Sequence, residues 1–526
     1  MSKSTGISDA ASASSPARVD APYTPAPLPK GFGWIYASLL VTMLLAALDQ
    51  TIVSTALPTI VGELDGVEQM AWTLTAYILA ATIVMPIYGK LGDLVGRKWI
   101  FVGGIVVFAA GSIVAGAAHD MTTLILGRGI QGLGGGGLMI MSQAIIADLV
   151  PARQRAKFMA PIGAVFGLAS VVGPLAGGWF TDSAHWRWAF WINLPLAAVA
   201  VVVAVVALKL PHTPTRVRID YLGILTMAVA VTATVLVANW GGTDYEWSDP
   251  LIIGLIIAAV LGWVAFFFVE SKVAEPIIPI RMLRNRIFVM GTLLGMIVVG
   301  VGMFAIVGYM PTYLQMVYGT TATESGLLLI PMVAGMLLTS IPSGVVISRT
   351  GRYKLWPILG TTLVGAAAVL LSTLQIDTPL WMLSTYLLLI GAGMGMMMQT
   401  LVLAVQNAFP ISEVGTATSA NNFFREIGAT LGIAVIGAIF TNRLTDALTS
   451  NLPGSLADGS ASSLTPALVH TLPADVQVAI IESYHSALVP VFGYLVPVFI
   501  VGLVLAIFLP EKPLAETNAD QAEVTA

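Results

Sequence analysis

The sequence predicts an all-α membrane protein with fourteen transmembrane helices, and three observations lead to this fold class. First, 57% of its 526 residues are hydrophobic, only 10% are charged and the mean hydropathy is +0.87, whereas about a quarter of the residues of a soluble protein are charged. Second, apolar runs close to the ~20 residues that a span needs recur along the whole chain. Third, the polar connections between these runs alternate between cationic and non-cationic. Lipid must therefore be the solvent for much of the surface.

The apolar runs divide the chain into successive spans. They begin near Trp34, Met70, Trp99, Met121, Ala156, Trp188, Ile219, Leu251, Ile287, Gly326, Leu355, Pro379, Gly415 and Ser486. A lead rich in Ala, Ser and Pro precedes the first run, so we interpret that run as a retained helix rather than a signal peptide. We expect the lead itself to be disordered, because it has too little apolar surface to bury.

Lysine and arginine residues in the connections predict the orientation, because cationic loops are retained on the cytoplasmic side. The even-numbered connections are cationic and contain Lys90, Arg97 and Lys98; Arg153, Arg155 and Lys157; Lys209, Arg216 and Arg218; Lys272, Arg281, Arg284 and Arg286; Arg349, Arg352 and Lys354. The odd-numbered connections hold almost none, with Arg187 and Arg443 as the exceptions. We therefore expect both termini in the cytoplasm. The alternation favours fourteen spans over thirteen, because one lost span would move every later cluster to the wrong side.

A short repeat divides the spans into two halves, as in many secondary transporters. The segment GKLGDLVGRKW at 89–99 recurs as GVVISRTGRYK at 344–354, with Gly89, Gly96 and Arg97 matched by Gly344, Gly351 and Arg352, and with Asp93 replaced by Ser348. The predicted domains are a disordered cytoplasmic tail (1–33), an N-terminal six-helix bundle (34–210), a two-helix insert with its linkers (211–285), a C-terminal six-helix bundle (286–510) that includes an extracellular loop (443–485), and a cytoplasmic tail (511–526).

Several kinds of site are not indicated by the sequence. It contains no Cys, and its five His are scattered without the spacing of metal ligands. Gly127, Gly129 and Gly132 spell GxGxxG, but they lie inside an apolar run without a preceding strand, so we interpret them as helix-packing glycines. No Walker A sequence occurs. We expect no enzyme activity, no metal, no cofactor and no nucleic-acid partner, and a monomer driven by the proton gradient.

Two charged residues lie deep in apolar runs of the first half. Asp49 is about nine residues, or roughly 13 Å, from the outer end of the first span, and Arg128 is about seven residues, or roughly 10 Å, into the fourth. A charge at the bilayer centre costs about 2.5 to 3.5 kcal/mol on insertion scales. The guanidinium needs an acceptor, which Asp49 or backbone carbonyls can supply. One interpretation is a proton site gated by Arg128; the other is a structural role for each charge.

Arg425 and Glu426 are deep charges of the thirteenth span. Adjacent helical residues point about 100° apart, so we expect that these two cannot pair with each other. Each then needs a partner on another helix or an aqueous cavity. Glu426 is a second candidate for proton coupling, together with Arg425, and the alternative is that both brace the second bundle.

The fifth span contains GPLAGG, with Gly173, Pro174 and Gly177. Proline bends a helix, and small residues allow two helices to approach closely. We expect tight packing against another helix here. The same segment is a candidate pivot or seal between the two halves.

Methionine, amide and tyrosine side chains of the second half are candidates for a substrate pocket. Thioethers adapt to varied apolar molecules, although each Met is also ordinary core filling. The predicted pocket residues are Met303, Tyr309, Met310, Gln315, Met398, Gln399, Gln406 and Asn421.

Four motifs, in this order, resemble those of the fourteen-span drug:proton antiporters of the major facilitator superfamily over about residues 34–510. LDQTIVSTALP resembles the first-span motif of that branch, GKLGDLVGRKW its loop motif between spans two and three, RGIQGLGGGG its fourth-span motif, and GPLAGG the fifth-span motif of exporters. The resemblance implies the major facilitator fold, with two six-helix bundles and two inserted helices.

The resemblance also implies roles for single residues. Asp93 and Arg97 would form a cytoplasmic charge relay that locks the outward-facing state. Arg128 would take part in proton transfer, and Asp49 would be coupled to protonation or substrate. The predicted conformational relay therefore consists of Gly89, Asp93, Gly96, Arg97, Gly173, Pro174 and Gly177.

These features together predict proton-driven export of hydrophobic or cationic drug-like compounds by alternating access, by a multi-pass protein of the bacterial cytoplasmic membrane. Its expected partners are the lipid bilayer, small substrates and protons. The alternative is an exporter or flippase of a lipid or a lipid-linked glycan. A receptor would leave Asp49, Arg128 and Glu426 as unexplained insertion costs, and an intramembrane enzyme would need a catalytic dyad or a metal cluster.

Overall fold

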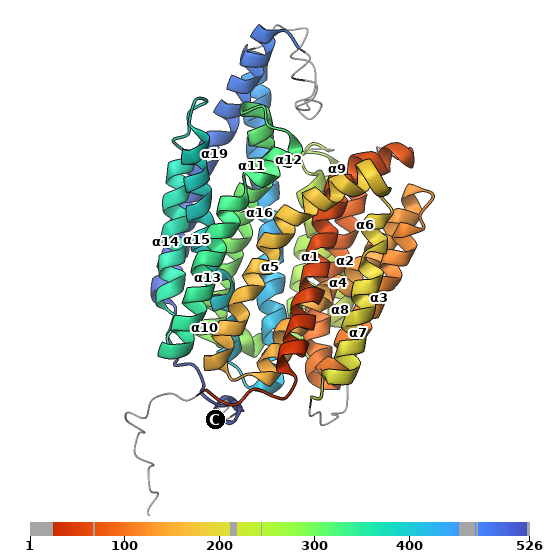
Figure 1. Ribbon diagram of the computed structural model, residues 1–526, viewed down its shortest axis with the longest axis vertical. Helices are drawn as coiled ribbons and strands as arrows, with labels where there is room; N and C mark the ends of the chain where they lie inside the picture. Colours follow the sequence, from red (N-terminus) through yellow and green to blue (C-terminus); the bar gives the residue numbers. More distant parts are fainter. Residues whose placement is uncertain are drawn as a thin grey trace, which may run out of the picture.

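The computed structural model describes residues 25–66, 69–210, 218–242, 245–451, 469 and 472–522. Within these ranges long helices run side by side along one direction (Figure 1). Thirteen of them are long and apolar enough to cross a bilayer, and Leu355–Leu371 is a shorter apolar helix. Together they match the fourteen predicted passes. Most of the predicted N-terminal tail lies outside the described residues.

The first six passes form one bundle. They are α1 (Phe32–Glu63), α2 (Met70–Val95), α3 (Arg97–Gly116), α4 (Met121–Leu149), α5 (Ala152–Trp179), and a sixth pass made of α6 (Trp188–Trp191) and α7 (Asn193–Ala207). At one end of this bundle, Arg187 donates to Glu63 Oε1 (2.8 Å) and to the carbonyl of Ala118 (2.8 Å). This pairing accounts for one of the two cations that break the predicted charge alternation.

Helix α4 is the most buried span of the first bundle, with 89% of the residues in its most apolar stretch buried. Most of its glycines leave no room for a side chain: a Cβ at Gly127 would lie 2.6 Å from Ala115 N of α3, and one at Gly136 would lie 2.8 Å from Ala81 Cα of α2. Close backbone contact of this kind is how small residues hold membrane helices together. The glycine run therefore places α4 between α2 and α3.

The last six passes form the second bundle. They are α10 (Arg286–Leu294) continued by η4 (Gly295–Met303) and α11 (Phe304–Val317), then α12 (Ala322–Leu327) with α13 (Ile330–Thr350), α14 (Leu355–Leu371), α15 (Leu380–Asn407), α16 (Val414–Asn451) and α19 (Ala474–Phe508). A short helix, α20 (Asn518–Ala522), follows. The start of α1 and the C-terminal segment lie at the same end of the molecule (Figure 1), as an even number of passes requires.

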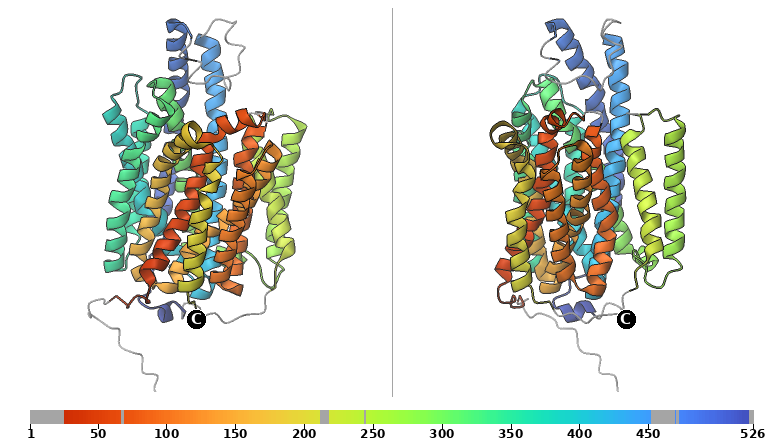
Figure 2. Two further views of the ribbon diagram at one scale, coloured as in Figure 1. Left: turned by 45° about the vertical axis from the view of Figure 1, so that its right-hand side comes forward. Right: turned by 90° about the vertical axis from the view of Figure 1, so that its right-hand side faces the viewer.

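The two inserted helices, α8 (Tyr221–Trp240) and α9 (Pro250–Glu270), form an antiparallel pair at one edge of the molecule (Figure 2). The pair contacts one helix from each bundle. The ring of Trp240 lies 5.6 Å from that of Trp72 on α2, and the ring of Trp263 lies 6.0 Å from that of Phe423 on α16. The insert therefore covers the line where α2 and α16 meet.

The structure corrects the predicted loop at 443–485. Residues 443–451 continue α16 and residues 474–485 begin α19, and the two helices project beyond the bundles (Figure 1). Leu444, Leu448 and Ile480 are each less than 5% exposed, and Asn451 Nδ2 donates to Ser483 Oγ (3.0 Å). These apolar residues belong to one buried core cluster, which stabilises the helical extensions. All but the first residue of NLPGSLADGSASSLTP lies outside the described residues.

Candidate functional site

Asp49 and Arg128 form a fully buried ion pair inside the first bundle. The carboxylate comes from α1 and the guanidinium from α4, and neither side chain is exposed at all. Arg128 Nη1 donates to Asp49 Oδ2, while Gln131 Nε2 and Asn193 Nδ2 each donate to Asp49 Oδ1 over 2.9 Å. A buried charge is tolerated when it is paired and its remaining lone pairs are satisfied. The carboxylate meets both conditions.

The surroundings of this pair satisfy the guanidinium less completely. Arg128 Nε donates to the carbonyl of Thr73 (3.3 Å), and its Cζ lies 4.4 Å from the centre of the Tyr77 ring. Ser112 Oγ accepts from Gln131 Nε2 (2.7 Å) and from the Asn193 amide (3.2 Å). Among the described residues Arg128 Nη2 has no hydrogen-bond partner. Protonation of the carboxylate would remove the only anionic partner of Arg128 among the described residues and leave it with two neutral acceptors, Gln131 Oε1 (2.8 Å) and the Thr73 carbonyl.

Two kinds of acceptor were expected for Arg128, the Asp49 carboxylate and backbone carbonyls. The structure confirms both, because Arg128 pairs with Asp49 and also donates to the carbonyl of Thr73. Sequence reasoning missed Gln131, Asn193 and Tyr77. Gln131 is three residues after Arg128, on the same helical face, so its spacing could have revealed it. An amide at the start of the sixth pass and a tyrosine in the second give no comparable signal in sequence.

The hinge between α2 and α3 forms a second charged cluster. Gly96 lies between the end of α2 and the start of α3. Its φ of 106° is in the region that favours glycine. The tight turn brings Arg97 back to Asp93, with Nη2 2.7 Å from Oδ1. Arg97 also pairs with Asp148 at the end of α4 and donates to the Ala144 carbonyl (3.0 Å).

Asp93 also joins the two bundles. It caps the start of α16, because Oδ1 accepts from Gly415 N (3.1 Å) and Oδ2 accepts from Thr416 N (2.7 Å). An anion at a helix N-terminus satisfies orphan N–H groups and the helix dipole. Arg97 Nη2 adds a bond to the carbonyl of Ile411 (2.8 Å). A Cβ at Gly89 would lie 2.6 Å from the Gly415 carbonyl. The predicted relay residues therefore hold α2 against α16 in this conformation.

The second copy of the repeat makes the corresponding contact with α5. A Cβ at Gly344 would lie 2.7 Å from the Ala156 carbonyl, just as Gly89 contacts α16. No carboxylate stands at the aligned position, Ser348. Instead, Arg153 of α5 donates to the backbone carbonyls of Ser348 (3.2 Å) and Arg349 (2.6 Å).

The GPLAGG segment packs on α1, as expected. A Cβ at Gly173 would collide with Thr51, and one at Gly177 would lie 2.9 Å from the Ile52 carbonyl. Pro174 lies 3.8 Å from the Cβ position of Gly326 at the start of the second bundle's second pass. The segment therefore contacts both bundles, while its role as a pivot stays a prediction.

The structure shows that the expectation for Arg425 and Glu426 was wrong. The two adjacent side chains do pair, with Arg425 Nη2 3.2 Å from Glu426 Oε1. The long guanidinium arm spans the angle between neighbouring positions on the helix. Arg425 is 5% exposed and Glu426 25% exposed at the side chain.

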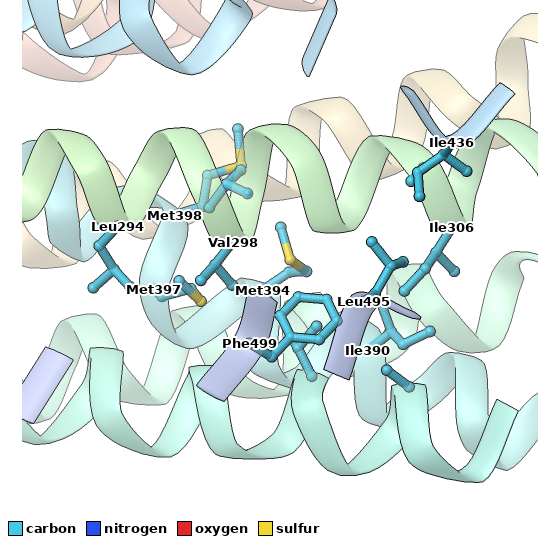
Figure 3. Close-up of a cluster of buried hydrophobic side chains, with 14 of the residues drawn as sticks. Leu294, Val298, Ile306, Ile390, Met394, Met397, Met398, Ile436, Leu495 and Phe499 are labelled. Carbon is cyan, nitrogen blue, oxygen red and sulfur yellow. The ribbon is translucent and has the colours of Figure 1, made fainter. Parts of the chain in front are cut away.

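The structure does not gather the predicted pocket residues into one cavity. Met398 belongs to the packed core of the second bundle, beside Met394 and Met397 (Figure 3), and Met310 is also fully buried in that core. Their chemistry is that of core filling, one of the two interpretations of the methionines. Nothing is described of the Met303 side chain.

The polar members of the predicted pocket are spread along the second bundle. Gln315 contacts Ser325 (3.2 Å), Asn421 contacts Thr292 (3.1 Å), and Gln406 contacts Thr418 (2.9 Å) and Arg155 (3.1 Å). The ring of Tyr309 lies 5.5 Å from that of Phe440, tilted against it. Gln399 lines a cavity between α5, α13 and α15. Both of its amide atoms lack a hydrogen-bond partner among the described residues. Substrate binding by any of these residues stays a prediction.

Fourteen passes arranged as two bundles, with buried charges and a junction that joins the bundles at one end, define a polytopic membrane transporter. The profile of the Major Facilitator Superfamily matches residues 39–433. The chain belongs to this superfamily, and it is a transporter rather than an enzyme.

The similar proteins cover most of the chain. An uncharacterized MFS-type transporter of Mycobacterium tuberculosis (strain ATCC 25618 / H37Rv) is 42% identical over 92% of this chain and 70% of its own length. The multidrug transporter protein MdtP of Bacillus subtilis (strain 168) is 38% identical over 93% of this chain and 95% of its own length. The crystal structure of the human organic anion transporter MFSD10 superposes with a TM-score of 0.60 at 15% identity, over 91% of this chain and all of that chain. The predicted fold and family are thereby confirmed.

Proposed function

We propose that this chain exports hydrophobic or cationic drug-like compounds in exchange for protons, by alternating access and without a cofactor. The buried pair of Asp49 and Arg128 is the observation that carries the proposal. It is the only fully unexposed ion pair among the described residues, and its carboxylate has a defined set of donors that protonation would release. The names of relatives, such as the multidrug transporter MdtP, support the substrate class.

Helix α4 connects the proposed proton site to the junction between the bundles. It carries Arg128 at one level and Asp148, a partner of Arg97, twenty residues further on, which is roughly 30 Å along a helix. A rigid α4 transmits any displacement at Arg128 to the Asp93–Arg97 cluster. Protonation of Asp49 would thus shift the balance between the conformation described here, in which Asp93 caps α16, and one in which the junction opens.

The setting is the cytoplasmic membrane of a bacterium. Relatives from Bacillus and Mycobacterium support this location, although related efflux pumps also occur in fungi. The cationic connections place the Asp93 junction on the cytoplasmic side. The structure described here is then closed toward the cytoplasm, and a monomer is sufficient for the cycle.

Transport into proteoliposomes under an imposed pH gradient tests the proposal. The parent should accumulate ethidium, a hydrophobic cation, only while the gradient is present. Asp49→Asn should lose the gradient-driven component, and Asp446→Asn, which removes an exposed carboxylate of α16, should keep it. Accumulation that survives collapse of the gradient in the parent would refute proton coupling. An Asp49→Asn variant with parental pH dependence would remove Asp49 from the proposal.

A further inference from the structure

The segment that follows the last transmembrane helix runs across the end of the molecule where the two bundles meet (Figure 1). It comprises residues 510–522 and ends in α20. Leu514 and Gln521 are buried, at 3% and 0% exposure. Such burial is unexpected for a short polar segment, and its contacts with each bundle explain it.

The first half of this segment is bound to the second bundle. Tyr353 Oη donates to the Pro510 carbonyl (2.9 Å) and accepts from Lys512 N (3.1 Å). Burial raises the pKa of the Tyr353 hydroxyl to about 12, so it remains a donor at physiological pH. Leu514 N donates to the Gly351 carbonyl (3.1 Å). The hinge of the second repeat copy is thus part of the binding surface.

The second half of the segment is bound to the first bundle. Ala515 O accepts from Arg153 N (3.0 Å) at the start of α5, and Glu516 forms an ion pair with the Arg153 side chain. Asn518 Nδ2 donates to the Asp148 carbonyl (3.1 Å) at the end of α4. These bonds tie the segment to the helix that also carries Arg128.

Gln521 bonds to both bundles with one side chain. Its Nε2 donates to the carbonyls of Gln406 (2.7 Å) and Phe409 (3.1 Å) in the second bundle. Its Oε1 accepts from Arg155 Nη2 (3.3 Å) in the first bundle. When the bundles separate, the Gln521 side chain cannot keep its bonds to both of them, so a fully buried amide loses hydrogen bonds on one side, which makes opening costly.

The two repeat copies differ in the group that accepts N–H groups at the start of the neighbouring helix. At the α2–α16 junction the carboxylate of Asp93 accepts the N–H groups at the start of α16. At the α5–α13 junction the aligned residue is Ser348, and the Ala515 carbonyl accepts the N–H of Arg153 near the start of α5. Initial N–H groups of a helix need an acceptor from outside the helix.

We propose that residues 510–522 form a cytoplasmic strap that binds only the conformation closed toward the cytoplasm and thereby stabilises it. The strap does at the α5–α13 junction what Asp93 does at the α2–α16 junction. The inference rests on the alternating access proposed above, but not on the identity of the coupling ion. Opening of the cytoplasmic side must release the strap from at least one bundle.

A single introduced cysteine can test this, because the chain contains no Cys. Ser343 is 2% exposed and lines the cavity between α5, α13 and α15, so Ser343→Cys reports opening between the bundles. Its labelling by a membrane-impermeant maleimide is measured in inside-out vesicles, without substrate or gradient. In that background Gln521→Ala should raise the labelling rate about threefold to tenfold, as expected for the loss of buried hydrogen bonds from one state only.

Glu511→Ala is the matched control. Glu511 is an exposed residue of the strap whose side chain makes none of the bridging bonds above, so its removal should leave the labelling rate at the parental value. Asn518→Ala serves as a second test variant that removes the bond to α4, in case Gln521→Ala folds poorly.

Parental labelling rates in both test variants would overturn the strap. The proton-coupling proposal is judged separately, because this labelling involves no gradient. Loss of coupling at Asp49 and loss of protection at Ser343 are therefore independent outcomes.

Discussion

At the scale of single residues, the buried pair of Asp49 and Arg128 is held by complementary hydrogen bonds rather than by attraction alone. The desolvation of two buried charges consumes much of their mutual attraction. Gln131 and Asn193 therefore matter, because they occupy the second carboxylate oxygen. Removal of one charge should be far more damaging than removal of both.

We expect Arg128→Gln to lower the free energy of unfolding by about 3 to 5 kcal/mol, because it leaves a buried carboxylate without its cation. The double variant Asp49→Asn/Arg128→Gln should recover most of this loss, since two amides can hydrogen-bond to each other and to Gln131. Thermal unfolding in detergent measures both effects. A double variant no more stable than Arg128→Gln would contradict this account of the pair.

At the scale of helices, the glycine run of α4 decides where the charged residues lie. Gly127 and Gly136 bring α4 within backbone contact of α3 and α2, and this close packing fixes the lateral position of the helix that carries Arg128. Not every glycine of the run has this role. A Cβ at Gly132 would collide with the Tyr77 carbonyl, whereas one at Gly129 would meet nothing within 4 Å.

Gly132→Ala should therefore destabilise the protein by about 1 to 3 kcal/mol, because backbone atoms of α2 must move. Gly129→Ala, the control three residues away, should be neutral or stabilising by up to about 1 kcal/mol, since alanine is the better helix former. Melting temperatures of the two variants give the comparison. Equal melting temperatures would mean that α4 is not held by close packing at Gly132.

At the scale of the whole molecule, two related junctions hold the bundles together at the end where α1 begins and the C-terminal segment lies. One joins α2 to α16 through Gly89 and Asp93, and the other joins α5 to α13 through Gly344. The inserted helices cover the α2–α16 line from the side. A bulky side chain at either glycine should act as a wedge.

Gly89→Leu should prevent closure of the cytoplasmic end, because its side chain would occupy the space of Ser419 and of the Gly415 backbone. We expect at least tenfold slower export and faster maleimide labelling of Ser343→Cys, with the protein still folded by size-exclusion chromatography. Gly103→Leu, at an exposed position with nothing within 4 Å, is the control. Parental export by Gly89→Leu would rule out the close contact as a requirement of the cycle.

Local features of the sequence were enough to predict the spans, the hinge and the depth of the charged residues. Whether a segment spans the bilayer depends on its own apolar length, and which side a loop occupies depends on its own Lys and Arg content. Both can therefore be predicted segment by segment. The repeat located Gly89 and Gly344 at equivalent places. The pairing of Asp49 with Arg128 could be anticipated from the sequence, because few charged residues of opposite sign lie at the same depth.

Other expectations failed where the outcome depends on packing. Arg425 reaches Glu426 because of side-chain length, not helical angle. Residues 443–451 extend α16, and Leu444 and Leu448 there are buried in the same core cluster as Ile480 of α19, more than thirty residues away in the chain. The predicted pocket residues are spread along the second bundle in this conformation, and their role in substrate binding stays a prediction.

The sequence by itself determined that this protein is a fourteen-pass membrane transporter with two related halves, because apolar length and loop charge are properties of each segment alone. Only the tertiary structure decided the partners of those segments. Asn193 on Asp49, Asp93 on the start of α16 and Gln521 between Arg155 and Gln406 are contacts between residues far apart in the chain. Hydrogen bonds have short range, so they exist only once the helices have packed.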